Sequence, residues 1–199
     1  MLVQWCLKGV AESTAFGDPQ ARAALAQDGL TTSWLRTAGG LLTSLPAGSH
    51  TALSQSALDA HVNGFAGVAS QTPYLSLSAG CIELDPATLK TTKYEARLTA
   101  LDFATDGGTT DGYLFKLWVL VSPKQAPELP GFGEEVRELN IFRQFAKFHH
   151  EGEIAAKLFV PARQIQKVEK YRSDLTFDWD EWNPDFVPPE RVSNVLDLI

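Results

Sequence analysis

The feature that most constrains the fold is a nearly unbroken apolar run, Tyr113–Val121 (YLFKLWVLV), whose one charged residue is Lys116. The residue types favour a β-strand, and the lack of alternation between polar and apolar residues means that neither face of the strand can meet water. Such a strand has to be central in a sheet, with other elements over both faces. The chain is therefore expected to fold around a sheet with a buried centre.

Strand and helix signals follow one another irregularly along the rest of the chain. Strands are expected at Leu2–Val10, Leu30–Trp34, Tyr74–Ser78, Ile154–Val160 and Ile165–Tyr171. Helices are expected at Ala21–Gln27, Leu58–Phe65, Tyr94–Thr105 and the start of Val136–Phe148, and loops at residues 36–51 and 122–133. Because strands and helices do not alternate regularly, the predicted class is α+β and not a doubly wound parallel sheet.

The chain of 199 residues has the length of one domain. From Ser173 onward it becomes acidic and aromatic and carries three prolines. We therefore expect one folded domain over residues 1–172 and a C-terminal tail over residues 173–199 that lies against it.

Charge and hydropathy limit the partners and the compartment. A formal net charge of −7 argues against a function that depends on a phosphate-binding surface, because such surfaces are basic. No apolar run approaches the ~18 residues of a membrane span, and Gln4 and Lys8 interrupt the apolar start that a cleaved leader needs. Cys6 and Cys81 have apolar neighbours and are expected to be buried free thiols. The protein is expected to be cytoplasmic, or delivered into a host or target cell without a cleaved leader, and not to bind a membrane.

Two familiar ligand motifs are incomplete in this chain. Gly131–Val136 (GFGEEV) lacks the third glycine of a dinucleotide-binding fingerprint and follows a proline-rich loop instead of a strand. His149 and His150 are adjacent, so in a strand they would point to opposite sides, and no second ligand cluster accompanies them. We therefore expect no metal site.

Four segments combine chemically useful residues with a defined local structure. The first ends the N-terminal strand with Lys8 and Gly9. The second is the strand Tyr74–Ser78 (YLSLS), whose period of two places Tyr74, Ser76 and Ser78 on one face. The third is the helix that precedes the apolar run. The fourth is Glu151-Gly152-Glu153, which stands directly before a late apolar strand.

In this order and spacing, the four segments resemble the mono-ADP-ribosyltransferase family, in the branch of cholera toxin and the arginine-specific transferases. That branch carries Arg on the first strand, a Ser-Thr-Ser strand, and Glu-x-Glu before a late strand. The resemblance covers roughly residues 2–171. It implies an ADP-ribosyltransferase-like split mixed β-sheet with flanking helices, and NAD as the substrate that donates ADP-ribose and releases nicotinamide.

The resemblance implies catalytic roles for Glu153, Glu151 and Ser76. Cleavage of the bond between nicotinamide and ribose leaves an oxocarbenium-like sugar, which a carboxylate beside the ribose stabilises. Glu153 is expected to be that carboxylate, because it opens an apolar strand that can hold it rigidly, and Ser76 is expected to hydrogen-bond both Glu153 and the ribose. Glu151 is expected to orient or deprotonate the acceptor. It shares a side with Glu153 if the segment is extended, and Gly152 would leave the turn free to adapt.

The residues expected to contact NAD are Lys8, Gly9, Tyr74, Ser76 and Ser78, although core packing is the favoured role of Tyr74. Lys8 stands where the resembling family has Arg. The planar fork of Arg binds phosphate at two points, whereas Lys offers a point charge. Either Lys8 still holds the pyrophosphate or ribose, helped by Arg36 or Lys116, or this copy has lost activity.

The sequence thus predicts an NAD-dependent mono-ADP-ribosyltransferase of the toxin or effector kind, acting on a protein arginine in preference to a nucleic acid. The alternative is a catalytically silent module with the same fold. Such a module would bind a partner or inhibitor protein through the tail and its aromatic residues Trp179, Trp182 and Phe186. Release of nicotinamide from NAD would distinguish the enzyme from the binding module.

Overall fold

The computed structural model describes residues 2–40, 45–84, 87–121, 132–135 and 152–192, and for residues 2, 81–84, 91–94 and 132–135 it describes the backbone alone. The helix expected at the start of Val136–Phe148, the His149–His150 pair and Glu151 lie outside the described residues. Among the described helices, none combines the length and the apolar character needed to cross a bilayer.

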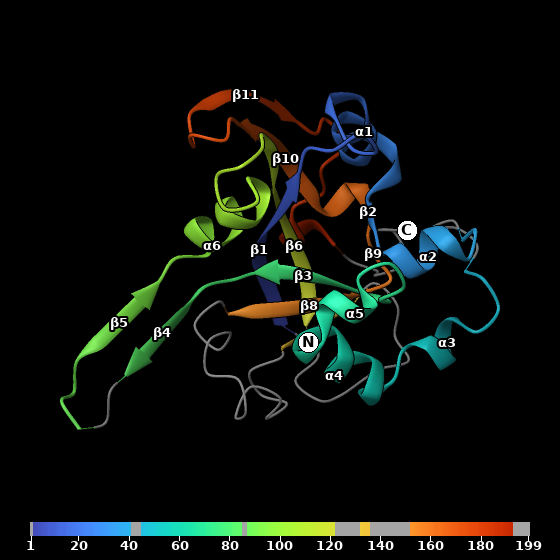
Figure 1. Cartoon of the computed structure of the whole chain (residues 1–199), viewed down its shortest axis with the longest axis horizontal. Helices are drawn as coiled ribbons and strands as arrows, with labels where there is room; N and C mark the ends of the chain where they lie inside the picture. The colour runs from blue at the N-terminus through green and yellow to red at the C-terminus, as the bar shows by residue number, and fades with distance from the viewer. Residues whose placement is uncertain (1, 41–44, 85–86, 122–131, 136–151, 193–199) are drawn as a thin grey trace.

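A seven-stranded mixed sheet forms the centre of the protein (Figure 1). Its strands, in spatial order, are β1 (Leu2–Ala11), β3 (Tyr74–Ser78), β8 (Glu153–Lys157), β7 (Phe132–Glu135), β6 (Gly112–Val121), β10 (Ile165–Tyr171) and β11 (Phe177–Trp182). β6 and β7 are parallel, and the other pairs of this sheet are antiparallel. β1 follows β6 along its whole length but meets β3 at the pair Leu7 and Ser78, so the sheet is split beside β1.

The apolar run occupies the central position predicted for it. β6 pairs with β1 along one edge, and along the other edge it pairs with β10 and then with β7. Phe115 and Trp118, which belong to opposite faces of the strand, are both fully buried at 0% exposure. The exposed Lys116 lies with its ammonium 5.3 Å from the centre of the Trp5 ring.

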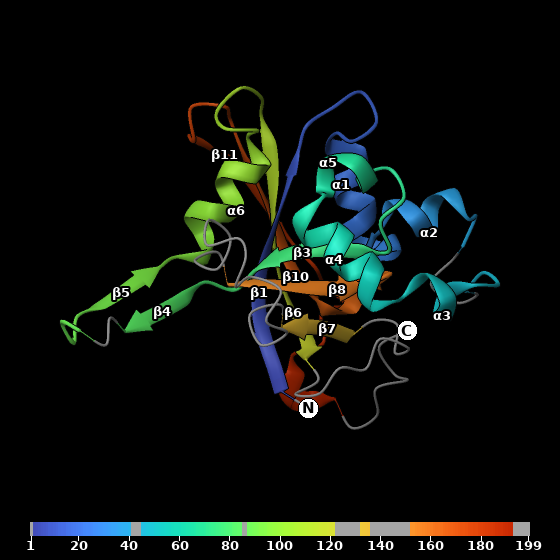
Figure 2. The same cartoon turned by 60° about the horizontal axis from the view of Figure 1, so that its bottom comes forward.

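Helices cover both sides of this sheet. Figure 2 shows α6 (Ala96–Ala104) on one side and α1–α5 gathered on the other. These five are α1 (Asp18–Ala23), which continues as the π-helix η1 (Ala24–Asp28), α2 (Ser33–Thr37), α3 (Ser49–Ala52), α4 (Gln55–Asn63) and α5 (Phe65–Val68).

The remaining elements are short. β2 (Leu30–Thr31) pairs with β9 (Phe159–Val160), and the 3-10 helices are η4 (Ala162–Gln164) and η5 (Pro189–Arg191). β4 (Cys81–Leu84) and β5 (Thr91–Tyr94) form a hairpin that projects away from the sheet (Figures 1 and 2). No local pattern in the sequence predicted this hairpin.

α6 lies directly on β1 and β6 because two glycines leave room for its backbone. A Cβ atom added at Gly112 would lie 1.6 Å from the carbonyl oxygen of Ala104, and one added at Gly9 would lie 2.0 Å from that of Ala100. Contacts this short are impossible for any larger residue without moving the helix. Gly9 therefore allows the close packing of α6, and its expected contact with NAD stays a prediction.

The structure corrects two boundaries of the predicted strands. The strand expected at Leu30–Trp34 ends at Thr31, because the side chain of Thr32 accepts a hydrogen bond of 3.2 Å from the backbone N–H of Leu35 and so caps α2. The strand expected at Ile154–Val160 is interrupted at Leu158, whose φ of +62° takes the backbone out of the extended region. Its N–H and C=O bind Pro73 and Thr32 instead.

The residues after Ser173 contribute directly to the sheet. Within the expected tail, β11 pairs with β10 from Lys167↔Trp182 to Tyr171↔Phe177. Beyond β11, the indole N–H of the buried Trp118 donates a hydrogen bond of 2.9 Å to the carbonyl of Val187. The division at residue 172 stays a prediction, but residues 177–187 belong to the sheet and contact its core.

An ionic cluster fixes the start of α1 to the sheet. The carboxylate of Asp18 accepts hydrogen bonds from Lys170 Nζ at 2.8 Å and from the Tyr113 hydroxyl at 2.6 Å. These two bonds, that from Lys170 above all, lower the pKa of Asp18 from its ordinary value of 3.8. A carboxylate with a lowered pKa in the folded state stabilises the fold above its unfolded pKa, and this stabilisation disappears as the pH falls through the folded pKa.

We therefore expect the variant Asp18→Asn to be less stable than the wild type at neutral pH, and this difference to shrink as the pH falls below 3.8. Urea unfolding monitored by tryptophan fluorescence at a series of pH values measures the difference. A difference that stays constant down to the lowest pH at which both proteins fold would contradict this role of Asp18.

Candidate active site

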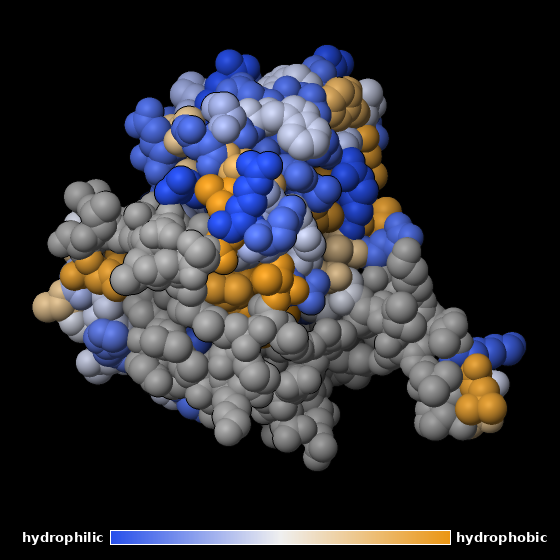
Figure 3. All heavy atoms as spheres, turned by 180° about the vertical axis from the view of Figure 1, so that it is seen from behind, coloured by the Kyte–Doolittle hydropathy of each residue, from blue (hydrophilic) through white to orange (hydrophobic). Residues whose placement is uncertain are grey.

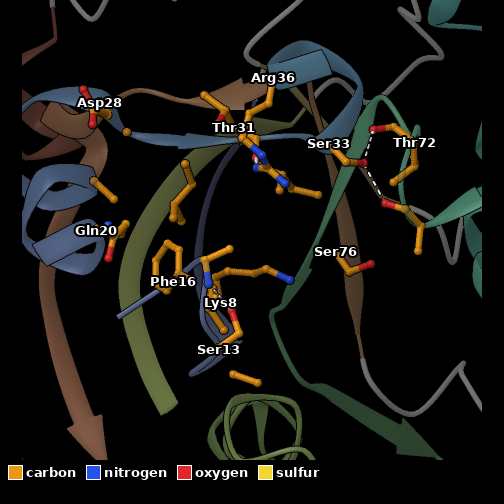
Figure 4. A pocket seen from close by; sticks show the side chains of 18 of the residues that line it. Lys8, Ser13, Phe16, Gln20, Asp28, Thr31, Ser33, Arg36, Thr72 and Ser76 are labelled. Atoms are coloured by element: carbon orange, nitrogen blue, oxygen red, sulfur yellow. Dashed lines mark hydrogen bonds between the residues drawn. The ribbon is translucent and has the colours of Figure 1, made fainter. Parts of the chain in front are cut away.

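A cavity of about 790 Å³ lies on the side of the sheet that α1–α5 cover (Figure 4). β1 contributes Lys8 to its lining, the segment leading into α1 contributes Phe16, β2 and α2 contribute Thr31 and Arg36, and β3 contributes Ser76. The volume is within the range of sites for small molecules and cofactors. Among the described lining residues, Asp28 is the one carboxylate.

The imidazole of His61, at one end of this cavity, is the meeting point of three elements. His61 lies on α4 and is 2% exposed. Its Nε2 atom lies 2.9 Å from Ser76 Oγ on β3 and 3.5 Å from Glu153 Oε1 on β8. The hydroxyl and the carboxylate, 77 residues apart in the chain, are therefore close together around one ring nitrogen.

The pairing of β3 with β8 explains why Ser76 and Glu153 converge. Ser78 stands opposite Glu153, and Ser76 stands opposite Ala155. Residues directly opposite in an antiparallel pair share a face, so Ser76, Ser78 and Glu153 all belong to the face toward α4.

A second contact fixes the orientation of the His61 ring. Thr72 Oγ1 lies 2.8 Å from His61 Nδ1, and Thr72 is itself buried. The hydroxyls of Thr72 and Ser76 can each donate or accept, so either neutral tautomer of the ring satisfies both contacts. Phe65 and Tyr74 pack against the ring, with centroid distances of 5.5 and 5.6 Å. The imidazole is thus held on all sides before any ligand binds.

Lys8 supplies a cation to the same end of the cavity. It is half-buried on β1, and in Figure 4 its side chain reaches across the cavity toward Ser76. Burial lowers the pKa of the Lys8 ammonium, and the negative charge of Glu153 partly opposes that effect. Lys8 and Glu153 are therefore near enough to interact, although their positions lie on different strands.

Some of the residues expected to contact NAD line the cavity, and others do not. Lys8, Tyr74 and Ser76 line the cavity, and Tyr74 is also a core residue at 2% exposure. Ser78 is buried beside Glu153 in the strand pair, and the missing Cβ of Gly9 makes room for α6. Of the two residues considered as helpers of Lys8, Arg36 lines the cavity, whereas Lys116 contacts Trp5.

The backbone directly before Glu153 is not extended. Gly152 has a φ of +57°, and a Cβ atom there would lie 2.0 Å from the carbonyl oxygen of Gly80. This left-handed, tightly packed position requires glycine, so Gly152 fixes the turn and does not leave it free to adapt. The condition under which Glu151 and Glu153 would share a side is not met at Gly152, and Glu151 itself lies outside the described residues.

Two residues of this site were missed by the sequence analysis, His61 and Thr72. A signal for His61 was present: it lies three residues after Leu58 and next to Val62, on a helix face that was otherwise apolar. A polar residue on a buried face needs a hydrogen-bond partner. Nothing in the local sequence identified Ser76 and Glu153 as the groups it contacts.

The arrangement suits a reaction in which positive charge develops on a sugar. A rigidly held carboxylate can stabilise such charge, and a neighbouring hydroxyl and imidazole can orient it. Lys8 and Arg36 give the cavity two cations, which suits an anionic ligand. In the ranges that the structure describes, no three side chains gather that could hold a metal ion.

Comparison with known proteins shows similarity in fold. The solved structure of EcPltA matches with a TM-score of 0.52 at 11% sequence identity, over 94% of this chain and 89% of that chain. The catalytic domain of the mosquitocidal toxin from Bacillus sphaericus matches with a TM-score of 0.44 at 11% identity, over 94% of this chain and 57% of that one. No protein-family model and no curated protein sequence matches the chain. The predicted α+β fold, an ADP-ribosyltransferase-like mixed sheet with flanking helices, is confirmed.

Proposed function

We propose that this protein is a mono-ADP-ribosyltransferase of the toxin or effector kind, which cleaves NAD and transfers ADP-ribose to a macromolecule. The observation that carries the proposal is the convergence of Ser76 and Glu153 on His61 Nε2, beside a cavity that also holds Lys8. The resemblance marks Ser76 and Glu153 as catalytic and Lys8 as substrate-binding, and the three residues come from three separate strands.

The proposed reaction breaks the bond between nicotinamide and the ribose C1′ atom. Nicotinamide leaves with the electron pair of that bond as a neutral molecule, and the ribose develops oxocarbenium character. The Glu153 carboxylate stabilises this charge. The acceptor then attacks C1′, forms the new glycosidic bond and loses one proton.

His61 is assigned a positioning role in this reaction. Its contact with Glu153 at 3.5 Å and its contact with Ser76 at 2.9 Å hold both groups in one place, and Thr72 holds the ring from its other side. A carboxylate that is already oriented does not have to reorganise when charge develops on the substrate, which favours catalysis.

A protein arginine is the proposed acceptor, and the proposed setting is the cytoplasm of the producing cell or of a target cell. The net charge of −7 makes a nucleic acid the less suitable acceptor, because two polyanions repel. The alternative of a silent binding module has less support. The acidic groups Asp178, Asp180 and Glu181 of β11 already pair with Arg172, Lys167 and Arg22.

Incubation with NAD labelled in its adenylate half, together with a lysate and separately with an arginine-containing peptide, tests the proposal. We expect release of free nicotinamide and label bound to protein or peptide. Nicotinamide release without bound label would identify a hydrolase instead, and the absence of both would overturn the proposed function.

The variant Lys8→Met tests whether this lysine supports NAD binding. Removal of one charged hydrogen bond to a phosphate or ribose is expected to weaken NAD binding by about tenfold or more. Stability should stay the same or rise, because the buried ammonium of Lys8, whose pKa is lowered, costs free energy in the folded state. Calorimetric titration with NAD and urea unfolding measure the two effects.

Lys116→Met is the matched control, since Lys116 is an exposed lysine of the same sheet that lies against Trp5 and does not line the cavity. It should bind NAD like the wild type. Equal NAD affinity of the Lys8→Met protein and the wild type would exclude Lys8 from the binding site.

A further inference from the structure

We infer that Arg36 is a second anchor for a diphosphate group, opposite Lys8 in the cavity, and that the site therefore selects nucleoside diphosphates. The inference rests on the proposed function for the identity of the ligand, and it concerns a residue that the sequence left as one of two possible helpers of Lys8. It follows from where Arg36 lies, how its helix is held and which charges surround it.

Arg36 reaches the cavity from the side opposite β1. In Figure 4 its side chain projects from α2 into the same space that Lys8 enters from below. Its guanidinium donates a hydrogen bond to the backbone carbonyl of Thr31, another lining residue. One donor of the guanidinium is used in this bond, and no other described residue takes up the remaining donors.

The helix that carries Arg36 is joined to the catalytic end of the cavity. Ser33 Oγ donates to the carbonyl of Ala69 at 2.7 Å and lies 3.4 Å from that of Thr72, and the N–H of Trp34 donates to Thr72 O at 3.2 Å. Thr72 is the residue that holds His61. Arg36 and His61 are thus fixed to one segment, and the spacing between the anion anchor and the reacting groups is set by the fold.

Among the described lining residues, two cations, Lys8 and Arg36, stand against one carboxylate, Asp28, and this favours an anionic ligand. In the described parts of the chain neither cation forms an ion pair with a carboxylate. By contrast Arg22, Arg97, Lys167, Lys170 and Arg172 all form such pairs. The negative charge of Glu153 partly compensates Lys8, and an anionic ligand would compensate the charge of Arg36.

Arg36 also resolves the open question about Lys8. A lysine offers a point charge, whereas an arginine offers a planar fork that binds two phosphate oxygens at once. In this chain the fork comes from α2 instead of the first strand. Lys116 cannot bind the same phosphate as Lys8. It stands opposite Leu7, and neighbouring residues of a strand point to opposite faces, so Lys8 and Lys116 belong to opposite faces of the sheet.

The variants Arg36→Gln and Arg36→Lys test the inference, with Arg22→Gln as a control for loss of an arginine outside the cavity. ADP-ribose, ADP and adenosine are titrated into each protein by calorimetry, and the melting temperature of each protein is measured. We expect Arg36→Gln to bind ADP-ribose and ADP about 10- to 100-fold more weakly, with Arg36→Lys in between. The adenosine affinity and the melting temperature of Arg36→Gln should match those of the wild type. Arg22→Gln should bind all three ligands like the wild type.

The outcomes separate this inference from the proposed function. If the wild type binds ADP-ribose but Arg36→Gln binds it equally well, Arg36 is no anchor, and the proposed function is untouched. An equal loss of adenosine and ADP affinity would also overturn the inference, because it would mean that Arg36 shapes the cavity and does not contact phosphate. If the wild type binds neither ADP-ribose nor ADP, the inference and the proposed function both fail.

Discussion

Replacement of Glu153 by glutamine is expected to reduce the rate of nicotinamide release from NAD by about 10²- to 10³-fold. The change removes the negative charge that the proposed reaction places beside the ribose, and it keeps the size and shape of the side chain. Glu153 is nearly buried, at 8% exposure, and one of its oxygens lies 3.5 Å from His61 Nε2. If the proposed reaction is right, this charge acts on the transition state without reorganisation, because the contact with His61 already orients the carboxylate.

The loss should appear in the turnover rate and not in NAD affinity, since the carboxylate acts on charge that develops during the reaction. Steady-state kinetics of nicotinamide release and calorimetric titration with NAD measure the two quantities. Glu181→Gln is the matched control, because Glu181 lies on β11, where it contacts Arg22. A decrease of less than about tenfold for Glu153→Gln would place the charge-stabilising group elsewhere.

Replacement of Gly112 by alanine is expected to destabilise the fold by about 3 kcal/mol or more. The added methyl group would have to fit where the carbonyl oxygen of Ala104 lies, 1.6 Å from the ideal Cβ position. Neither backbone can move easily, since Gly112 pairs with Ala11 in β1 and with Tyr171 in β10, while Ala104 ends α6. The melting temperature should fall by about 6–12 °C for a loss of this size in a chain of this length.

Gly67→Ala provides the comparison for this effect. Gly67 lies in α5, and a Cβ atom there would meet nothing within 4 Å. The free energy of unfolding of the Gly67→Ala protein should differ from that of the wild type by less than about 1 kcal/mol. If the two variants were equally stable in urea unfolding, the close contact of α6 with β6 would not hold in solution.

Elements with a strong local pattern could be predicted from the sequence. The apolar run became β6, the strand Tyr74–Ser78 became β3 with the same bounds, and the helix expected at Tyr94–Thr105 became α6. In each case the local pattern of apolar and polar residues indicates the type of element. Cys6 is a buried free thiol, as its apolar neighbours indicated.

Elements that depend on distant partners could not be predicted in the same way. β11 forms because β10 offers an open edge to the acidic, aromatic segment that follows it. The break at Leu158 exists because its backbone bonds with Pro73 and Thr32, which are more than 80 residues away in the chain. Such contacts leave no periodic signal in the local sequence.

The sequence by itself determined the class of the fold, its central strand and the order of the segments that carry chemistry, because these follow from local patterns of polarity. Only the tertiary structure decided that His61 stands between Ser76 and Glu153, and that Arg36 shares a cavity with Lys8. The physical reason is that strand register and helix placement bring together groups that are far apart in the chain. Both depend on how the whole core packs, which no short stretch of residues specifies.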